Sequence, residues 1–313
     1  MILVTGAAGF VGSHLCDFLV EKGLDVCGTY WKGDTFDNIE HLRNSVNFVE
    51  CDITDKQRVE ELIKKIKPEY IFHMAAQSYV VPSWQDPEET LITNFMGTFY
   101  LLEAIRKAGI KPKIIIACSS SEYGLTEENE IPINEKKEFR PSSPYAVSKI
   151  GTDMIAYLYQ KAYKMKIIRI RFFNIIGSRK KFDVCADFAK GIAEIEKNKI
   201  EKLRIGNLNG IRDFTDIKDA IEAMWLLKDK GDFNEVYNVC SGKRYTVKEI
   251  LDKLISLSKK EIKLQQDPQK IRIMDDPIFL GDSTKIKKLG WRTKVPIEKT
   301  LSDILDYWRN KVD

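Results

Sequence analysis

The chain of 313 residues is 43% hydrophobic and 31% charged, and it is long enough to bury a large core. Its 50 basic and 46 acidic residues give a formal net charge of +4, and this near balance offers no electrostatic case for nucleic acid or membrane partners. No apolar run approaches the ~18 residues that a membrane-spanning helix needs.

Short apolar segments alternate with helical patterns along the first 170 or so residues. Strands are expected near 1–5, 25–30, 46–50, 69–73, 113–118 and 167–171, and helices near 10–22, 55–66, 88–108 and 144–163. This alternation predicts an α/β fold with a doubly wound parallel sheet of the Rossmann type. Ligands are then expected at the carboxyl ends of the strands.

From about residue 174 the pattern loosens. The expected elements are helices near 183–197, 216–229, 246–258 and 296–310, and strands near 203–206 and 236–239. We interpret 1–173 as one domain, with later returns to its sheet near 213–240. Residues 174–313 then form mainly a smaller C-terminal part.

The first twelve residues carry Gly6, Gly9 and Gly12 between an apolar strand and an amphipathic helix. Gly6 permits a tight turn, Gly9 lets the backbone approach a pyrophosphate, and Gly12 lets the helix pack on the strand. Free N–H groups at the helix N-terminus favour a phosphate there. We therefore expect the three glycines, with Phe10 and Val11, to bind NAD(H) or NADP(H).

The end of the second expected strand bears on the choice of cofactor. No acid stands there to bond the ribose 2′-hydroxyl, as it does in NAD-selective sites. Lys32 could pair with a 2′-phosphate or be a solvated surface lysine, so the pattern favours NADP(H) only weakly. Asp52 and Ile53 follow the third strand, where a carboxylate could bond the adenine amino group.

Tyr145 and Lys149 lie one helical turn apart, and Ser119 stands at the end of an apolar strand. The lysine would lower the phenol pKa from its usual value of about 10 and bond the nicotinamide ribose. The serine hydroxyl would hold the substrate oxygen. A lone Tyr-x-x-x-Lys is more often an ordinary helix pair, but together with the glycine loop it predicts hydride transfer between an alcohol and a ketone.

The six cysteines are scattered without a Cys-x-x-Cys pair, and the three histidines share no ligand spacing. This predicts reduced core thiols in a cytoplasmic protein and no metal site. The first strand is expected to begin at the N-terminus, and this pattern predicts that the protein has no signal peptide. His73 ends an apolar strand, where a packed core residue is more frequent than a catalytic one.

Over nearly its whole length the chain resembles the nucleotide-sugar branch of the extended short-chain dehydrogenase/reductases. The motifs that carry the resemblance are the glycine loop, Asp52-Ile53, His73-Met-Ala-Ala76, Asn94-Phe-Met-Gly97-Thr98, Ser119–Gly124, Ser143–Lys149, Arg171–Gly177 and Arg212–Asp216.

The resemblance implies that residues 1–173 bind NAD(P) and that 174–313 mainly bind substrate. It implies catalytic roles for Ser119, Tyr145 and Lys149, with Ala75 and Ala76 against the cofactor. The implied substrate contacts are Gln77, Ser120, Ser121, Asn174, Arg212 and Arg272. The helices near 88–108 and 144–163 would form a homodimer.

Segments 187–196, 206–216 and 236–242 most resemble GDP-6-deoxy-4-keto-mannose reductases, relatives of the GDP-mannose 4,6-dehydratases. Dehydratases of this branch carry an acid two places before Tyr123. Here Ser121 stands there, and Glu122 should point to the opposite side. The resemblance thus implies NAD(P)-dependent reduction of a GDP-linked 4-keto-6-deoxy sugar. A 4-epimerase with tightly bound NAD, a dehydratase and a non-catalytic scaffold or regulator are the alternatives.

Overall fold

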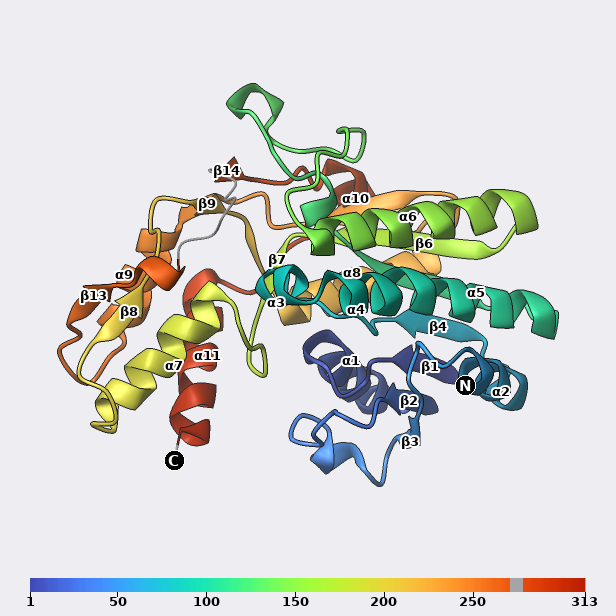
Figure 1. Cartoon of the computed structure of the whole chain (residues 1–313), viewed down its shortest axis with the longest axis horizontal. Coiled ribbons are helices and arrows are strands. Elements are labelled where there is room, and N and C mark those ends of the chain that lie inside the picture. Colours follow the sequence, from blue (N-terminus) through green and yellow to red (C-terminus); the bar gives the residue numbers. More distant parts are fainter. Residues whose placement is uncertain (271–277, 313) are drawn as a thin grey trace.

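The computed structural model describes residues 1–270 and 278–312 (Figure 1). Its main sheet is built from β1 (Ile2–Thr5), β2 (Val26–Tyr30), β3 (Asn47–Glu50), β4 (Tyr70–His73), β5 (Lys113–Ser119), β6 (Lys166–Phe172) and β11 (Val236–Val239). The strand order is β11-β6-β5-β4-β1-β2-β3, and all pairings are parallel. The predicted doubly wound fold is confirmed.

The central strands are apolar because both of their faces are covered. In β5 and β6, Ile114, Ile115 and Ile116 pair with Ile167, Ile168 and Arg169. The strand order reverses between β1 and β4, which are neighbours in the sheet although a pair of strands separates them in sequence. In such sheets, ligands bind at the carboxyl ends of the strands beside this reversal.

Helices cover the sheet on both faces (Figure 1). On one face lie α1 (Phe10–Glu21), α8 (Ile217–Lys230) and α10 (Thr284–Lys288), with Leu15, Leu19 and Met224 in the shared core. On the other lie α2 (Lys56–Ile66), α5 (Gly97–Ala108) and α6 (Pro144–Tyr163), with Leu62 and Leu101 buried beneath them. The two apolar clusters hold the sheet between them.

The helix expected near 88–108 is interrupted. It comprises α4 (Pro87–Leu91), a π-helical turn (Ile92–Met96) and α5, and a further short helix, α3 (Val80–Gln85), precedes it. Such π turns occur often at functional sites because they redirect side chains. Here the turn directs Asn94 into the interior, where it is 1% exposed.

A third, smaller apolar cluster lies at the end of the molecule where α7 (Val184–Glu196), α9 (Val247–Ser256) and α11 (Ile297–Lys311) pack together (Figure 1). The short strands around it are β7 (Asn174–Ile176), β8 (Leu203–Ile205), β9 (Ile211–Arg212), β10 (Phe214–Asp216), β12 (Tyr245–Thr246), β13 (Leu264–Gln266) and β14 (Ile278–Phe279). They form small sheets of two or three strands.

All six cysteines are buried and none forms a disulfide, as the sequence predicts. In the part of the chain that the structure describes, no helix is both long enough and apolar enough to cross a membrane.

Candidate active site

The glycine loop after β1 leaves no room for side chains. Gly6 has a positive φ of 67°, and a Cβ atom there would lie 2.8 Å from the Ala75 backbone. A Cβ atom at Gly12 would lie 2.1 Å from the Gly6 carbonyl oxygen. No side chain caps α1, so its first N–H groups are available to an anion. This junction holds five of the predicted cofactor residues: Gly6, Gly9, Phe10, Val11 and Gly12.

A buried histidine fixes the segment after β4 beside the glycine loop. His73 Nδ1 lies 2.8 Å from Thr5 Oγ1, and Nε2 lies 3.0 Å from Thr98 Oγ1. Thr5 Oγ1 also accepts a hydrogen bond from the Ala75 N–H at 3.2 Å, and Ala76 follows. Burial lowers the pKa of His73 to about 3. The prediction that His73 packs in the core is therefore confirmed, and its contacts help to hold Ala75.

Asn94 ties this same segment to helix α6. Its Oδ1 accepts a hydrogen bond from the Gln77 N–H at 2.8 Å, and its Nδ2 donates to Ser148 Oγ at 2.8 Å. The side chain of Gln77 bonds Thr90 Oγ1 at 3.2 Å and the Tyr79 N–H at 2.5 Å. Gln77, predicted to contact substrate, thus already has protein partners. Sequence analysis named Asn94 only within a family motif.

Helix α6 presents Tyr145 and Lys149 from its first turns. Ser143 caps the helix by accepting a hydrogen bond from a first-turn N–H at 3.1 Å, and Pro144 occupies the first helical position. The four-residue spacing places Tyr145 and Lys149 on one face, and both are buried. Lys149 Nζ donates to the Ala117 carbonyl oxygen at 2.8 Å, next to the end of β5.

Ser119 ends β5 beside Tyr145. Burial raises the pKa of Tyr145 to about 12, and the neighbouring Ser119 side chain opposes the rise. The expectation of a lowered phenol pKa is wrong for this structure, because burial outweighs the groups that oppose the rise. The phenol is buried, and the ammonium group is hydrogen-bonded to the Ala117 oxygen. A phenol with a raised pKa is neutral at pH 7 and able to donate a proton.

Glu122 lies beneath this pair. Its carboxylate accepts the Ser119 N–H at 2.8 Å and pairs with Arg171 at 3.1 Å, and its side chain is fully buried. Burial and the nearby Asp153 carboxylate raise its pKa, while Arg171 opposes the rise. Glu122 therefore lies in the core, and it stands in the 3-10 turn Ser120–Glu122 instead of on the strand end that sequence analysis expected.

Lys32 and Asp52 lie just past the ends of the neighbouring strands β2 and β3, and both are exposed. Asp52 Oδ1 accepts hydrogen bonds from the N–H and the hydroxyl of Thr54, each at 2.8 Å. Ile53 is buried against the start of α5, where a Cβ atom at Gly97 would lie 2.7 Å from it. Asp52 is thus held in a defined orientation at this edge.

Sequence analysis passed over Asp34 in the turn after β2. Its Oδ2 accepts the Trp31 N–H at 3.1 Å, and burial raises the pKa of this carboxyl group. The Gly33-Asp34 dipeptide, typical of turns, was the available signal. An acid therefore follows β2, in the turn after the strand instead of at the strand end.

The predicted substrate residues Asn174 and Arg212 lie close together. Asn174 opens β7 and donates through Nδ2 to the Asp213 carbonyl oxygen at 3.1 Å, directly after Arg212. The pairing of β7 with β10 brings these segments side by side. Ser120 is buried and Ser121 is half-buried in the turn after β5, directly after Ser119.

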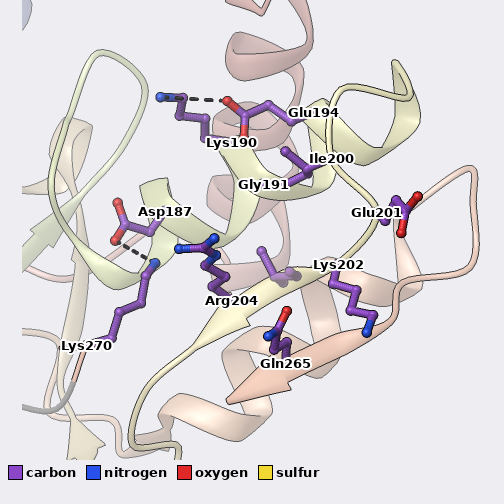
Figure 2. A pocket seen from close by; sticks show the side chains of 11 residues that line it. Asp187, Lys190, Gly191, Glu194, Ile200, Glu201, Lys202, Arg204, Gln265 and Lys270 are labelled. Carbon is purple, nitrogen blue, oxygen red and sulfur yellow. Dashed lines mark ion pairs between the residues drawn. The ribbon is translucent and has the colours of Figure 1, made fainter. Parts of the chain in front are cut away.

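A separate hollow of about 650 Å³ is bounded by α7, β8 and β13 (Figure 2). Figure 2 shows Lys190 reaching toward Glu194 and Lys270 toward Asp187, at nitrogen–oxygen distances of 3.8 and 3.6 Å. The predicted catalytic residues do not line this hollow. Two of its lysines pair with carboxylates along an open surface, and the end of β5 stays the expected place of the chemistry. The predicted substrate residue Arg272 lies outside the described residues.

Comparisons with known proteins agree with this geometry. Residues 3–304 match the family model described as GDP-mannose 4,6 dehydratase. The chain is 29% identical to GDP-6-deoxy-D-mannose reductase of Pseudomonas aeruginosa, over 99% of this chain and 98% of the relative. It is 30% identical to GDP-mannose 4,6-dehydratase of Yersinia enterocolitica, over 97% and 92% of the two chains.

Solved structures also match this chain over nearly its whole length. The structure described as RMD from Pseudomonas aeruginosa complexed with NADPH is 27% identical, with a TM-score of 0.85 over 99% of both chains. The UDP-glucose 4-epimerase of Thermotoga maritima, solved with UDP-glucose, is 30% identical, with a TM-score of 0.89 over 100% and 99% of the chains. The chain belongs to the GDP-mannose 4,6-dehydratase family, in the nucleotide-sugar branch of the extended short-chain dehydrogenase/reductases.

Proposed function

We propose that the chain is an NAD(P)-dependent reductase of a nucleotide-linked 4-keto-6-deoxy sugar, with a GDP-linked sugar as the favoured substrate. The observation that carries this proposal is the buried pair of Ser119 and a neutral Tyr145, with the neighbouring carboxylate of Glu122 turned into the core. A proton donor is present, whereas the oxygens of the neighbouring Glu122 bond the Ser119 N–H and Arg171. The Pseudomonas reductase, aligned almost end to end, supports the same activity.

Each of the three residues has a role in this reaction. Ser119 donates a hydrogen bond to the 4-keto oxygen and holds it beside the phenol. Tyr145 transfers its proton to that oxygen as negative charge develops there. Lys149 stabilises the resulting phenolate through its positive charge. A bound NAD(P)H supplies the hydride to C4.

The backbone at Gly6, Gly9 and Gly12 fits a dinucleotide pyrophosphate, because side chains there would occupy the cradle. We assign NADPH as the favoured cofactor, on the strength of Lys32 and the NADPH-bound neighbour of known structure. NADH is the alternative, and Asp34 is the acid that would bond its ribose. We assign cofactor binding to residues 1–173 and substrate binding mainly to 174–313, with Asn174 and Arg212 near the diphosphate.

We also propose a cytoplasmic homodimer. Six buried cysteines without a disulfide fit a reducing compartment. Helix α6 exposes an apolar face, formed by Val147, Met154, Tyr157 and Leu158, each at least 40% exposed. A contiguous apolar face of this kind is typical of an interface.

A nucleotide-sugar 4-epimerase is the second candidate, because the Thermotoga epimerase gives a TM-score of 0.89 against 0.85 for the NADPH-bound RMD structure. Both activities use the same three residues. They differ in whether the cofactor is consumed or retained.

The deciding experiment follows NADPH absorbance with GDP-4-keto-6-deoxymannose, generated by a separate mannose dehydratase, and with UDP-galactose as a control. We expect NADPH oxidation with the keto sugar alone, and slower or absent oxidation of NADH. NAD released on denaturation, together with conversion of UDP-galactose and no NADPH consumption, would establish the epimerase instead.

The variant Tyr145→Phe lacks the proton donor but keeps the ring. We expect kcat to fall by roughly 10²–10⁴-fold, in line with the loss of a positioned acid, while NADPH affinity stays nearly unchanged. Stopped assays and fluorescence titration measure the two quantities. Turnover at the wild-type level would contradict the role of Tyr145.

A further inference from the structure

Below the catalytic pair lies a buried chain of charged side chains. Asp153 on α6 is four residues beyond Lys149 and eight beyond Tyr145, so the three share one helix face. Asp153 accepts hydrogen bonds from Arg169 NH1 at 2.5 Å and from Arg171 Nε at 2.9 Å. Both arginines project from β6, and both are at most 5% exposed.

Arg171 extends this chain from α6 to the end of β5. Its Nε also bonds Glu122 Oε2 at 3.1 Å, and its NH1 donates to the Tyr123 hydroxyl at 3.0 Å and the Glu135 carbonyl oxygen at 3.1 Å. The guanidinium carbon lies 5.0 Å from the Tyr123 ring centroid and 4.7 Å from that of Phe139. Arg171 is thus fixed from several sides and can hold Glu122 in one orientation.

Glu122 is the last side chain of this charged series, and it is bonded to Ser119. Its Oε1 accepts the Ser119 N–H at 2.8 Å, while Ser119 Oγ accepts the Ser121 N–H at 3.1 Å. These reciprocal bonds form a capping box around a short turn. The turn fixes the backbone that carries the Ser119 hydroxyl, and this hydroxyl lies near enough to Tyr145 to oppose the rise of its pKa. A continuous buried path therefore connects the helix of Tyr145 to the backbone of the neighbouring Ser119.

We propose that Glu122 is a positioning residue, which sets the Ser119 hydroxyl against Tyr145 through the path Asp153–Arg171–Glu122. This inference rests on the proposed function for its kinetic consequence. It gives Glu122 a role different from the acid or base of a dehydratase, since its two oxygens bond Ser119 and Arg171.

The test compares Glu122→Leu with Glu122→Gln. Leucine fills the space but offers no acceptor to the Ser119 N–H, whereas glutamine keeps an oxygen there. We expect E122L to lower kcat by roughly 10–100-fold, as misplacement of a reacting group does, with NADPH affinity changed less than twofold. E122Q should recover most of the lost turnover. Equal kcat for E122L and wild type would overturn the proposal.

Asp219 supplies the matched control. It is another buried carboxylate that accepts backbone N–H groups, those of Lys294 at 2.9 Å and Val295 at 3.2 Å, between α8 and the segment after α10. Asp219→Leu should lower the melting temperature and leave kcat of the folded enzyme unchanged. A similar fall in kcat for D219L and E122L would show that both act only through stability.

A double-mutant cycle with Ser119→Ala separates positioning from packing. If Glu122 acts through the Ser119 hydroxyl, E122L should cost little further turnover in the S119A background. Equal losses in both backgrounds would overturn the proposal. Should E122L not fold, Glu122→Met takes its place, and failure of both variants to fold would assign Glu122 a purely structural role.

The cycle is run on whichever activity the wild-type enzyme shows, NADPH-dependent reduction or UDP-sugar epimerisation, because Ser119 serves both. Absence of reduction with intact epimerisation therefore rejects the proposed function and still tests Glu122. Hydrogen exchange at the Ser119 amide gives a readout without turnover. Exchange should be faster in E122L than in wild type, E122Q or D219L, and unchanged exchange would contradict the hydrogen bond.

Discussion

Gly12 shows how tightly the cofactor loop is built at the scale of single residues. The Cβ atom of an alanine would lie 2.1 Å from the Gly6 oxygen, and neither backbone segment can move without shifting α1 or β1. We expect Gly12→Ala to destabilise the fold by about 1–3 kcal/mol, as overpacking does, and to weaken NADPH binding. Urea unfolding and fluorescence titration measure the two effects.

Gly23 provides the control for this substitution. A Cβ atom there meets no atom within 4 Å, but φ is +69°. Gly23→Ala should therefore cost about 1 kcal/mol from backbone strain and leave NADPH affinity intact. Equal loss of affinity in both variants would show that the effect of Gly12→Ala is not local to the loop.

His73 should make stability depend on pH. Its folded pKa of about 3 lies below the unfolded value of 6.5, so the folded state favours the neutral ring. The free energy of unfolding that the neutral ring contributes is complete above pH 6.5. It is lost as pH falls toward 3, at about 1.4 kcal/mol per pH unit. Urea unfolding between pH 7 and 5 measures this slope. It should be smaller in His73→Gln, and identical slopes would contradict a buried neutral histidine.

Sequence analysis could find Gly6, Ser119, Tyr145 and Lys149 because each stands in a short local motif. It could not find the partners of Glu122, because Arg171 is 49 residues away in the chain and only the pairing of β5 with β6 brings them together. The predicted direction of the shift in the Tyr145 pKa was wrong for a related reason. Burial depends on the whole fold, whereas the spacing to Lys149 is local.

At the scale of elements, the N-terminus of α9 is held by a capping box. Thr246 Oγ1 accepts the Glu249 N–H at 3.0 Å, and Glu249 Oε2 accepts the Thr246 N–H at 2.7 Å. We expect Thr246→Ala to lower the free energy of unfolding by about 1 kcal/mol, whereas Thr246→Ser keeps the acceptor and most of the stability. Denaturant titration compares them, and equal stability for both variants would contradict the cap.

The periodicity of apolar residues predicted the long helices and the strands of the main sheet, because these elements bury one face or both. It did not predict the π turn at Ile92–Met96. The same residues would also suit a continuous helix, so the sequence holds no signal for the π turn. Asn94 is held in the core by hydrogen bonds to Gln77 and Ser148. These partners are distant in sequence, and only the tertiary structure brings them together.

At the scale of the whole molecule, the exposed face of α6 is the clearest sign of self-association. Met154 is 40% exposed and Leu158 is 53% exposed, one helical turn apart. We expect the double substitution Met154→Glu, Leu158→Glu to convert a dimer into a monomer, because it places charges in an apolar contact. Light scattering measures the mass. Leu257→Glu, at an exposed site after α9, should leave the dimer intact, and a monomeric wild type would contradict the interface.

The smaller apolar cluster, around α7, α9 and α11, is not built from one continuous stretch of the chain. Within the described residues, its buried side chains come from three stretches, 176–214, 247–254 and 301–305. Between them the chain returns to the main core, through 217–239 and again through Ile286 and Trp291. No single cut can therefore separate the two cores. Transplanting the smaller core from one relative to another would require three coordinated exchanges, so this core changes more readily by point substitutions than by recombining whole modules.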